Sequence, residues 1–209
     1  MKKLLILLLA VFPCVSGVVH EQSLSPCYKA DVIFIMDISG SMSDYRADYN
    51  LWMQDIVDNL PLSDNVMVGL MYFSNDICAP CMLTQDKYLL KLSVDDERSC
   101  GGVGSDLYPA LIRAHDYFEA NTVLREESVP RILIIVTDGD IENHEECIVY
   151  RQSKMADVLC VCINPGAPPQ CGSRSENTLK GLVGEKGFVI QGGLLNVYDE
   201  IFKDFEPCM

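Results

Sequence analysis

The chain has 209 residues, which suits one domain with a substantial core and is short for two. Its formal net charge is −14, from 30 acidic and 16 basic residues. Such an acidic surface repels nucleic acid and anionic membranes, so we expect no nucleic-acid partner. The charge favours metal ions or basic partners, or it serves only to keep the protein soluble.

The first 17 residues have the pattern of a secretory signal peptide. Two lysines precede an apolar run, Leu4–Phe12, and small residues follow up to Gly17. The run is too short to span a bilayer, and no later stretch approaches the roughly 20 apolar residues that a spanning helix needs. The pattern predicts a signal peptide over residues 1–17, a mature chain over residues 18–209, secretion, and no integral membrane segment after cleavage.

Ten cysteines are many for a reducing cytosol and fit an oxidising compartment. Cleavage after Gly17 removes Cys14 and leaves nine, so one thiol should be free, buried or bonded to another molecule. Lipidation of Cys14 is the alternative, but the residues before it are not small. The spacing of Cys78 and Cys81 is similar to that of a zinc knuckle or a redox pair, yet no second pair or nearby histidine completes a zinc set.

Short apolar runs alternate with longer segments of helical spacing along the rest of the chain. The predicted elements, in chain order, are strand Val32–Met36, helix Tyr45–Leu60, strand Val66–Phe73, helix Leu107–Ala120, strand Ile132–Val136, helix Glu145–Ala156, strand Val158–Ile163, helix Ser175–Gly184, strand Phe188–Ile190 and helix Leu195–Phe205. Runs of Val, Ile and Leu without alternation indicate strands covered on both faces. The order predicts an α/β fold with a doubly wound, mostly parallel central sheet flanked by helices.

Two of the predicted strands end in carboxylates. One strand runs directly into Asp37, with Ser39 and Ser41 on the following turn, and another is followed closely by Asp138. Ligands of such sheets bind at the carboxyl ends of the strands, where two carboxylates repel each other unless a proton or a cation lies between them. Carboxylate and hydroxyl oxygens suit Mg²⁺, Mn²⁺ or Ca²⁺. We expect Gly40 to allow the bend that brings the two hydroxyls together.

These stretches resemble a known family. "DISGSM" (residues 37–42) resembles the Asp-x-Ser-x-Ser opening of the metal-ion-dependent adhesion site in von Willebrand factor type A domains, and "ILIIVTDGD" resembles the later strand that supplies the family's second aspartate. The family's third element is usually a Thr in a glycine-rich loop before a helix. "GGVGSDLYPALIRA" is similar, with Ser105 at the place of the Thr, so the hydroxyl is retained and the β-branched methyl is absent. The resemblance covers about residues 30 to 206 and implies a single domain with a Rossmann-like fold over 18–209.

The resemblance also implies a function, that of a secreted, non-enzymatic adhesion or recognition module. A divalent cation, Mg²⁺ (or Mn²⁺ or Ca²⁺), would capture a Glu or Asp carboxylate of an extracellular protein partner. The metal ligands that it implies are Asp37, Ser39, Ser41, Ser105 and Asp138.

Several members of the family join the two ends of the domain by a disulfide. The resemblance therefore implies a bridge between Cys27 and Cys208, which would close nearly the whole domain into one loop. We further expect Cys78, Cys81 and Cys100 to lie in neighbouring loops and to supply a second bridge.

Each candidate ligand has a structural alternative. The cluster at residues 37–41 could instead cap the following helix, and Asp138 could serve a plain Asp-Gly turn. Ser105 could be the N-cap of the helix after it. We interpret Asp106 and Asp140 as solvated loop carboxylates.

Two other functions remain open. A metal-dependent phosphate or ester hydrolase would use Asp37 as nucleophile and the cation as electrophile, and it needs a nearby general acid or base. The only histidines are His20, His115 and His144, and of these only His144, six residues after Asp138, could reach the rim of the site. No Gly-x-Ser-x-Gly, Walker or His-Glu-x-x-His motif is present. The other function is that of a structural module whose metal site is vestigial.

Overall fold

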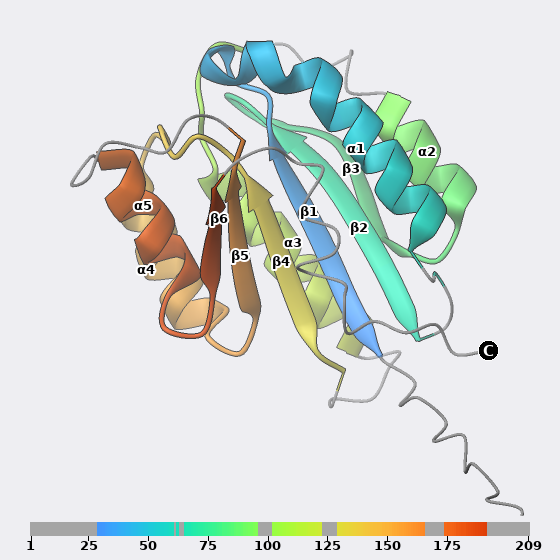
Figure 1. Cartoon of the computed structure of the whole chain (residues 1–209). Coiled ribbons are helices and arrows are strands. Elements are labelled where there is room, and N and C mark those ends of the chain that lie inside the picture. Colours follow the sequence, from blue (N-terminus) through green and yellow to red (C-terminus); the bar gives the residue numbers. More distant parts are fainter. Residues whose placement is uncertain are drawn as a thin grey trace, which may run out of the picture.

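A six-stranded sheet forms the centre of the computed structural model, which describes residues 29–60, 62, 65–95, 102–122, 129–165 and 174–191. The strands are β1 (Ala30–Asp37), β2 (Val66–Phe73), β3 (Ile77–Thr84), β4 (Arg131–Val136), β5 (Leu159–Asn164) and β6 (Phe188–Gln191). Their order across the sheet is β3-β2-β1-β4-β5-β6, and every neighbouring pair is parallel except β2 and β3 (Figure 1). The predicted fold class is therefore confirmed.

Helices cover both faces of the sheet (Figure 1). They are α1 (Arg46–Asn59), α2 (Lys87–Asp95), α3 (Tyr108–Thr122), α4 (His144–Lys154) and α5 (Arg174–Val183), with a 3₁₀ helix, η1 (Gly40–Tyr45), directly before α1. The first two pack on one face, and α3, α4 and α5 pack on the other. None of the helices in the described ranges is both long and apolar enough to cross a membrane.

The central strands are apolar on both faces because both faces are covered. In β1, Val32 and Phe34 join the half of the core that contains Trp52 of α1, whereas Ile33 and Ile35 join the half that contains α3. Phe34 meets Trp52 edge to face, with ring centroids 5.8 Å apart. A continuous apolar run, rather than an alternating one, is what such a strand requires.

Two elements, β3 and α2, were not predicted. β3 is an edge strand that pairs antiparallel with β2 through a ladder with two register shifts. It is partly exposed and contains Pro80, which an edge strand tolerates, so it lacks the Val and Ile run that marked the central strands. The expectation that Cys78 and Cys81 lie in a loop is wrong, because both belong to β3.

Several predictions concern residues outside the described ranges. These are the signal peptide over 1–17, the helix Leu195–Phe205, the bridge between Cys27 and Cys208, and any bridge to Cys100. All of them stay predictions.

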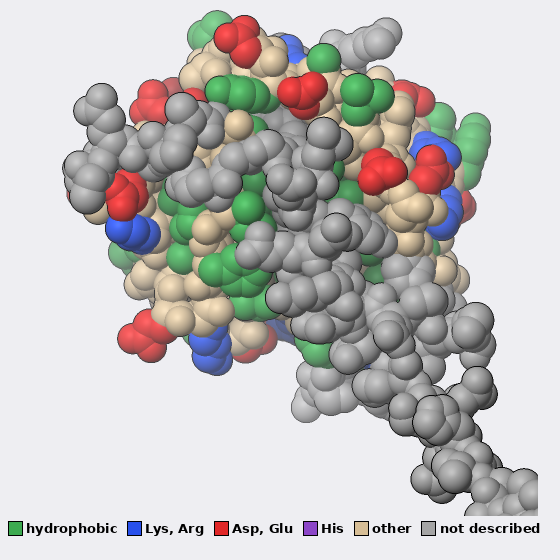
Figure 2. Space-filling model, viewed as in Figure 1, with side chains coloured by type: hydrophobic (Ala, Val, Ile, Leu, Met, Phe, Trp, Pro, Cys, Tyr) green, Lys and Arg blue, Asp and Glu red, His purple; other side chains and the backbone are tan. Residues whose placement is uncertain are grey.

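Charged side chains are dispersed over the face of the molecule that Figure 2 shows. Figure 2 shows Asp and Glu scattered around the visible face, with Lys and Arg interspersed among them. The acidic excess of the sequence is therefore distributed on this face rather than concentrated in one patch.

Candidate functional site

The carboxyl ends of β1 and β4 lie side by side. The two strands are parallel and in register, with Met36 opposite Val136. Asp37, which follows Met36, therefore lies beside Thr137, which follows Val136. The Oγ1 atom of Thr137 donates a hydrogen bond of 2.7 Å to Oδ2 of Asp37. The predicted site thus lies at the sheet edge where ligands of such folds bind.

Asp37 is fully buried and accepts three hydrogen bonds. The backbone N–H of Ser39 donates to Oδ1 at 2.9 Å, and the hydroxyls of Ser105 and Thr137 donate to Oδ2 at 3.0 and 2.7 Å. Burial raises the pKa of Asp37 above its ordinary value, and the side chain and backbone of Ser39 and the hydroxyls of Thr137 and Ser105 oppose that rise. No ion pair within the described ranges involves this carboxylate, so hydrogen bonds alone compensate its charge there.

The hydroxyls of Ser39 and Ser41 meet on the turn after β1. Their Oγ atoms are 3.2 Å apart, with Ser39 buried and Ser41 exposed. The Ser39 side chain makes no capping hydrogen bond to η1, which argues against the helix-cap alternative. Gly40 lacks a positive φ, and a Cβ there would come no closer than 3.8 Å to Val103, so the expectation that the bend needs glycine is wrong.

Ser105 approaches the buried carboxylate from the loop before α3. Its backbone is fixed on both sides, because Asp106 N donates to Ser74 O at 2.7 Å and Glu142 N donates to Ser105 O at 2.8 Å. The Ser105 side chain is buried and bonded to Asp37, so it is not the helix cap. Asp106 takes the capping role, since its Oδ1 accepts from Tyr108 N at 3.1 Å.

A glycine allows this loop to approach its neighbours. The N–H of Gly104 donates to Oδ1 of Asn75, in the turn between β2 and β3. A Cβ at Gly104 would lie 2.5 Å from that oxygen and 2.7 Å from Oε1 of Glu142. A larger residue would therefore push aside the side chains of Asn75 and Glu142 and weaken the hydrogen bond from Gly104 N that holds the loop of Ser105.

Asp138 lies on the turn after Thr137 and is half-buried. Its Oδ1 accepts from Asp140 N at 3.0 Å, as the Asp-Gly turn alternative requires. Gly139 has φ of 82°, and a Cβ there would be 2.8 Å from Ser175 O. The turn accounts for one oxygen of Asp138. In the described ranges no hydrogen bond joins Asp138 to the other four candidate ligands, which are linked to one another.

Thr137, Ser74 and Asn75 are site residues to which the sequence reasoning assigned no role. Thr137 contacts Asp37 directly, and the other two hold the loop of Ser105. Their position in the sequence could have identified them, because each comes just after a strand that is a neighbour of β1.

The donor set consists of oxygen atoms only. Serine hydroxyls and two carboxylates are hard ligands, which fit Mg²⁺, Mn²⁺ or Ca²⁺. Within the described ranges, no group of three or more His, Cys, Asp and Glu side chains could hold a metal. Cys78 and Cys81 therefore belong to no such metal cluster among these residues.

Each described histidine is hydrogen-bonded to a residue outside the cluster. His115 lies on α3 and its Nδ1 is 3.0 Å from the hydroxyl of Tyr150, while Nδ1 of His144 is 3.0 Å from a guanidinium nitrogen of Arg174. These contacts give no support to a histidine acting as general base for a hydrolase.

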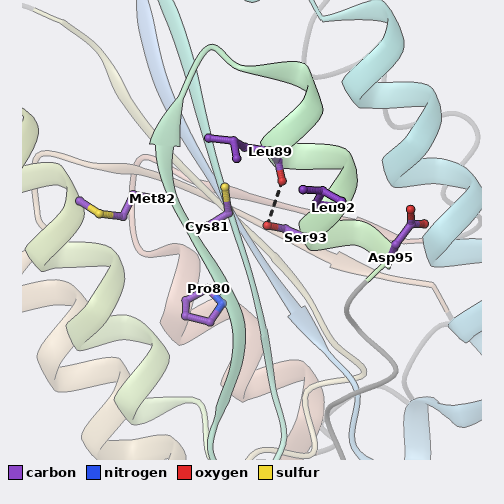
Figure 3. Close-up of a pocket in the computed structure, with 7 residues that line it drawn as sticks. All are labelled: Pro80, Cys81, Met82, Leu89, Leu92, Ser93 and Asp95. Atoms are coloured by element: carbon purple, nitrogen blue, oxygen red, sulfur yellow. Dashed lines mark hydrogen bonds between the residues drawn. The ribbon is translucent and has the colours of Figure 1, made fainter.

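A separate hollow of about 650 Å³ lies between β3 and α2, away from this edge (Figure 3). Its walls include Cys81, Met82, Leu89 and Leu92, and one hydrogen bond joins Ser93 Oγ to Leu89 O at 3.2 Å. Burial raises the pKa of the Cys81 thiol, which disfavours a nucleophilic thiolate. The hollow is mainly apolar and offers no catalytic pair.

Comparison with known proteins agrees with this geometry. A family model described as von Willebrand factor type A domain matches residues 32–140, a span that contains all five candidate ligands. The collagen alpha-4(VI) chain of Mus musculus is 30% identical over 128 residues, which are 58% of this chain and 6% of the collagen. The chain thus spans a small part of that relative.

Solved structures share the fold. A von Willebrand factor type A protein from Catenulispora acidiphila superposes with a TM-score of 0.65 at 17% identity, covering 85% of this chain and 43% of the other. The manganese-loaded TRAP protein of Plasmodium vivax gives a TM-score of 0.61 at 17% identity, covering 85% and 73%.

Proposed function

Because the chain belongs to the von Willebrand factor type A family, we propose that it is a secreted module that binds an extracellular protein partner through a divalent cation. The observation that carries the proposal is the Asp37 cluster. A buried carboxylate lies at the carboxyl edge of the two central strands, with the hydroxyls of Ser39, Ser105 and Thr137 around it.

The hydroxyls of Ser39, Ser41 and Ser105 would hold the cation, with Asp37 and Asp138 acting directly or through water. The 3.2 Å separation of the first two hydroxyls lets both face one point. A nearby positive charge would lower the pKa that burial raises at Asp37, so carboxylate and cation stabilise each other. Mg²⁺, Mn²⁺ or Ca²⁺ suits these ligands. The solved TRAP protein named as manganese-loaded supports a divalent cation in this fold.

A bound cation would offer an open position to an anionic oxygen, which in a protein partner is a Glu or Asp carboxylate. One such contact can dominate an interface when the surrounding loops exclude water. Acidic residues around the site oppose indiscriminate binding of acidic partners. Specificity would then come from the loops at residues 43–46, 102–106 and 140–146.

The test is capture of partners from extracellular material on the immobilised chain. We expect binding in Mg²⁺, loss in chelator, and loss in an Asp37→Ala, Ser39→Ala double variant. Glu185→Gln is the matched control, because it removes an exposed carboxylate outside these loops and should retain binding. Capture that is undiminished in chelator and in the double variant would refute the proposal.

One observation favours a second candidate, the structural module with a vestigial site. Three hydrogen bonds satisfy Asp37 without a cation, so the cluster could serve stability alone. In that case chelator should change neither partner binding nor thermal stability. Turnover of a phosphate or ester substrate that depends on Asp37 would instead indicate a hydrolase, for which the described histidines offer no support.

A further inference from the structure

A second concave site lies between α3 and α4, close to the loop of Ser105. It has a volume of about 550 Å³. The residues that line it are Tyr108, Glu145, Glu146, Val149, Tyr150 and Ser153. Tyr108 is the first residue of α3, three positions after Ser105, and Glu145 comes three positions after Glu142, which donates to Ser105 O. The hollow, here called the tyrosine pocket, therefore neighbours the candidate metal site.

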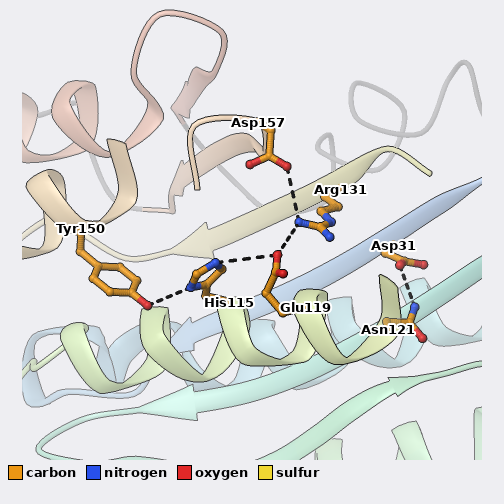
Figure 4. A network of polar contacts seen from close by, with 7 residues as sticks. All are labelled: Asp31, His115, Glu119, Asn121, Arg131, Tyr150 and Asp157. Atoms are coloured by element: carbon orange, nitrogen blue, oxygen red, sulfur yellow. Dashed lines mark hydrogen bonds and ion pairs between the residues drawn. The ribbon is translucent and has the colours of Figure 1, made fainter. Parts of the chain in front are cut away.

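Two aromatic rings form part of its wall. Tyr108 and Tyr150 meet edge to face, with centroids 5.4 Å apart and planes at 77°. The hydroxyl of Tyr150 is held by His115 at 3.0 Å, which fixes the ring's orientation (Figure 4). A ring face attracts a cation, and two rings nearly at right angles can face one cation from two sides.

The charged groups of the pocket are all acidic. Glu145 and Glu146 are exposed and form no ion pair within the described ranges, and no Lys or Arg is among the lining residues. The charge of Asp116 also reaches Tyr150 and contributes to its raised pKa, after burial. Acidic residues in the first turn stabilise the N-terminus of α4, which explains the two glutamates but not the aromatic hollow beside them.

We propose that the tyrosine pocket binds a Lys or Arg side chain of the protein partner. Charge complementarity and the two ring faces select a cation, and the exposed Val149 among the lining residues offers an apolar surface on which the stem of a long side chain can pack. That the same partner also presents its carboxylate at Asp37 rests on the proposed function. The partner would then carry an acidic and a basic residue on one surface.

The test is a titration of the full chain, followed by ¹⁵N-resolved NMR, with N-acetyl-arginine amide as probe and N-acetyl-citrulline amide as its uncharged analogue. We expect saturable shifts of Tyr108, Glu145, Glu146 and Val149 with the arginine probe only. A Glu145→Gln, Glu146→Gln variant should bind it about three- to tenfold more weakly, and Tyr108→Leu should lose more than Tyr108→Phe, which keeps the ring.

An Asp48→Asn, Glu185→Gln variant removes two exposed charges elsewhere and should bind the probe as wild type does. Equal shifts with citrulline, or equal weakening in this control, would overturn the proposal. Running the titration in chelator and again in Mg²⁺ separates the two ideas. Binding of the arginine probe in chelator would support the tyrosine pocket even if the chain binds no metal ion. Binding of Mg²⁺ without shifts from the arginine probe would reject the tyrosine pocket and leave the proposed metal site standing.

Discussion

Thr137 donates a hydrogen bond of 2.7 Å to Oδ2 of Asp37, although 100 positions separate the two residues in the chain. The same hydroxyl accepts from Gly139 N at 3.1 Å. Thr137 therefore fixes the buried carboxylate at the end of β1 and also supports the turn that carries Asp138. An apolar residue of the same shape can do neither.

Replacing Thr137 tests this double role. Thr137→Val should lower the free energy of unfolding by about 1–3 kcal/mol, because a buried N–H and a buried carboxylate each lose a partner. Thr137→Ser keeps the hydroxyl and should lose less. Urea denaturation in chelator measures both, and equal stability of the Val and Ser variants would show that the hydroxyl is unimportant.

The candidate ligands should contribute unequally to cation binding. Asp37→Ala and Asp138→Ala should abolish binding of Mg²⁺ and Mn²⁺, because each removes a negative charge from the site. Ser105→Ala removes one neutral oxygen and should weaken binding less. Isothermal calorimetry decides this, and wild-type affinity in Asp37→Ala would remove the cluster from consideration.

Stability in chelator should depend on pH through Asp37. Burial raises the pKa of this carboxyl above 3.8, so the folded chain holds the proton more tightly than the unfolded chain. The contribution of Asp37 to the free energy of unfolding is fully present below the pKa of the unfolded chain and is lost as pH rises through the pKa of the folded chain. Its size is about 1.4 kcal/mol for each unit by which the two pKa values differ. Unfolding midpoints from about pH 4 to about pH 7 should fall more in wild type than in Asp37→Asn. Excess Mg²⁺ should reduce that difference, and identical profiles in chelator would contradict the linkage.

Two glycines at the site should respond differently to substitution. Gly139 has φ of 82° and no room for a Cβ, so Gly139→Ala should destabilise the fold by about 1–3 kcal/mol. Gly40 has neither constraint, so Gly40→Ala should change stability by less than about 0.5 kcal/mol. Thermal melts of the pair provide the comparison, in which a larger loss for Gly40→Ala would be unexpected.

The predicted bridge between Cys27 and Cys208 can be tested chemically. On the chain-entropy model it would stabilise the domain by about 4 kcal/mol, because it closes nearly the whole chain into one loop. Non-reducing peptide mapping should recover the two cysteines in one linked fragment. Recovery of either with another partner would refute the pairing.

The central sheet was predictable because its strands are marked by composition. The run at Val32–Met36 and the one at Ile132–Val136 are apolar without alternation, and both end beside carboxylates, which is why the candidate site was predicted at their carboxyl ends. β3 escaped prediction, although its partner β2 was predicted, because an exposed edge strand needs no such run. Thr137 was missed for another reason. Its role depends on the register of β1 against β4, and register is a property of the folded sheet.

The antiparallel edge strand β3 affects how copies of the chain can associate when they are concentrated. Pro80 lacks the N–H that another strand would need, and the two register shifts in the ladder of β2 and β3 disturb the strand's regularity. The β3 border of the described sheet is therefore a poor template for a foreign strand. We expect many copies to stay apart at this border when they are concentrated in a confined space, instead of stacking edge to edge into fibrils.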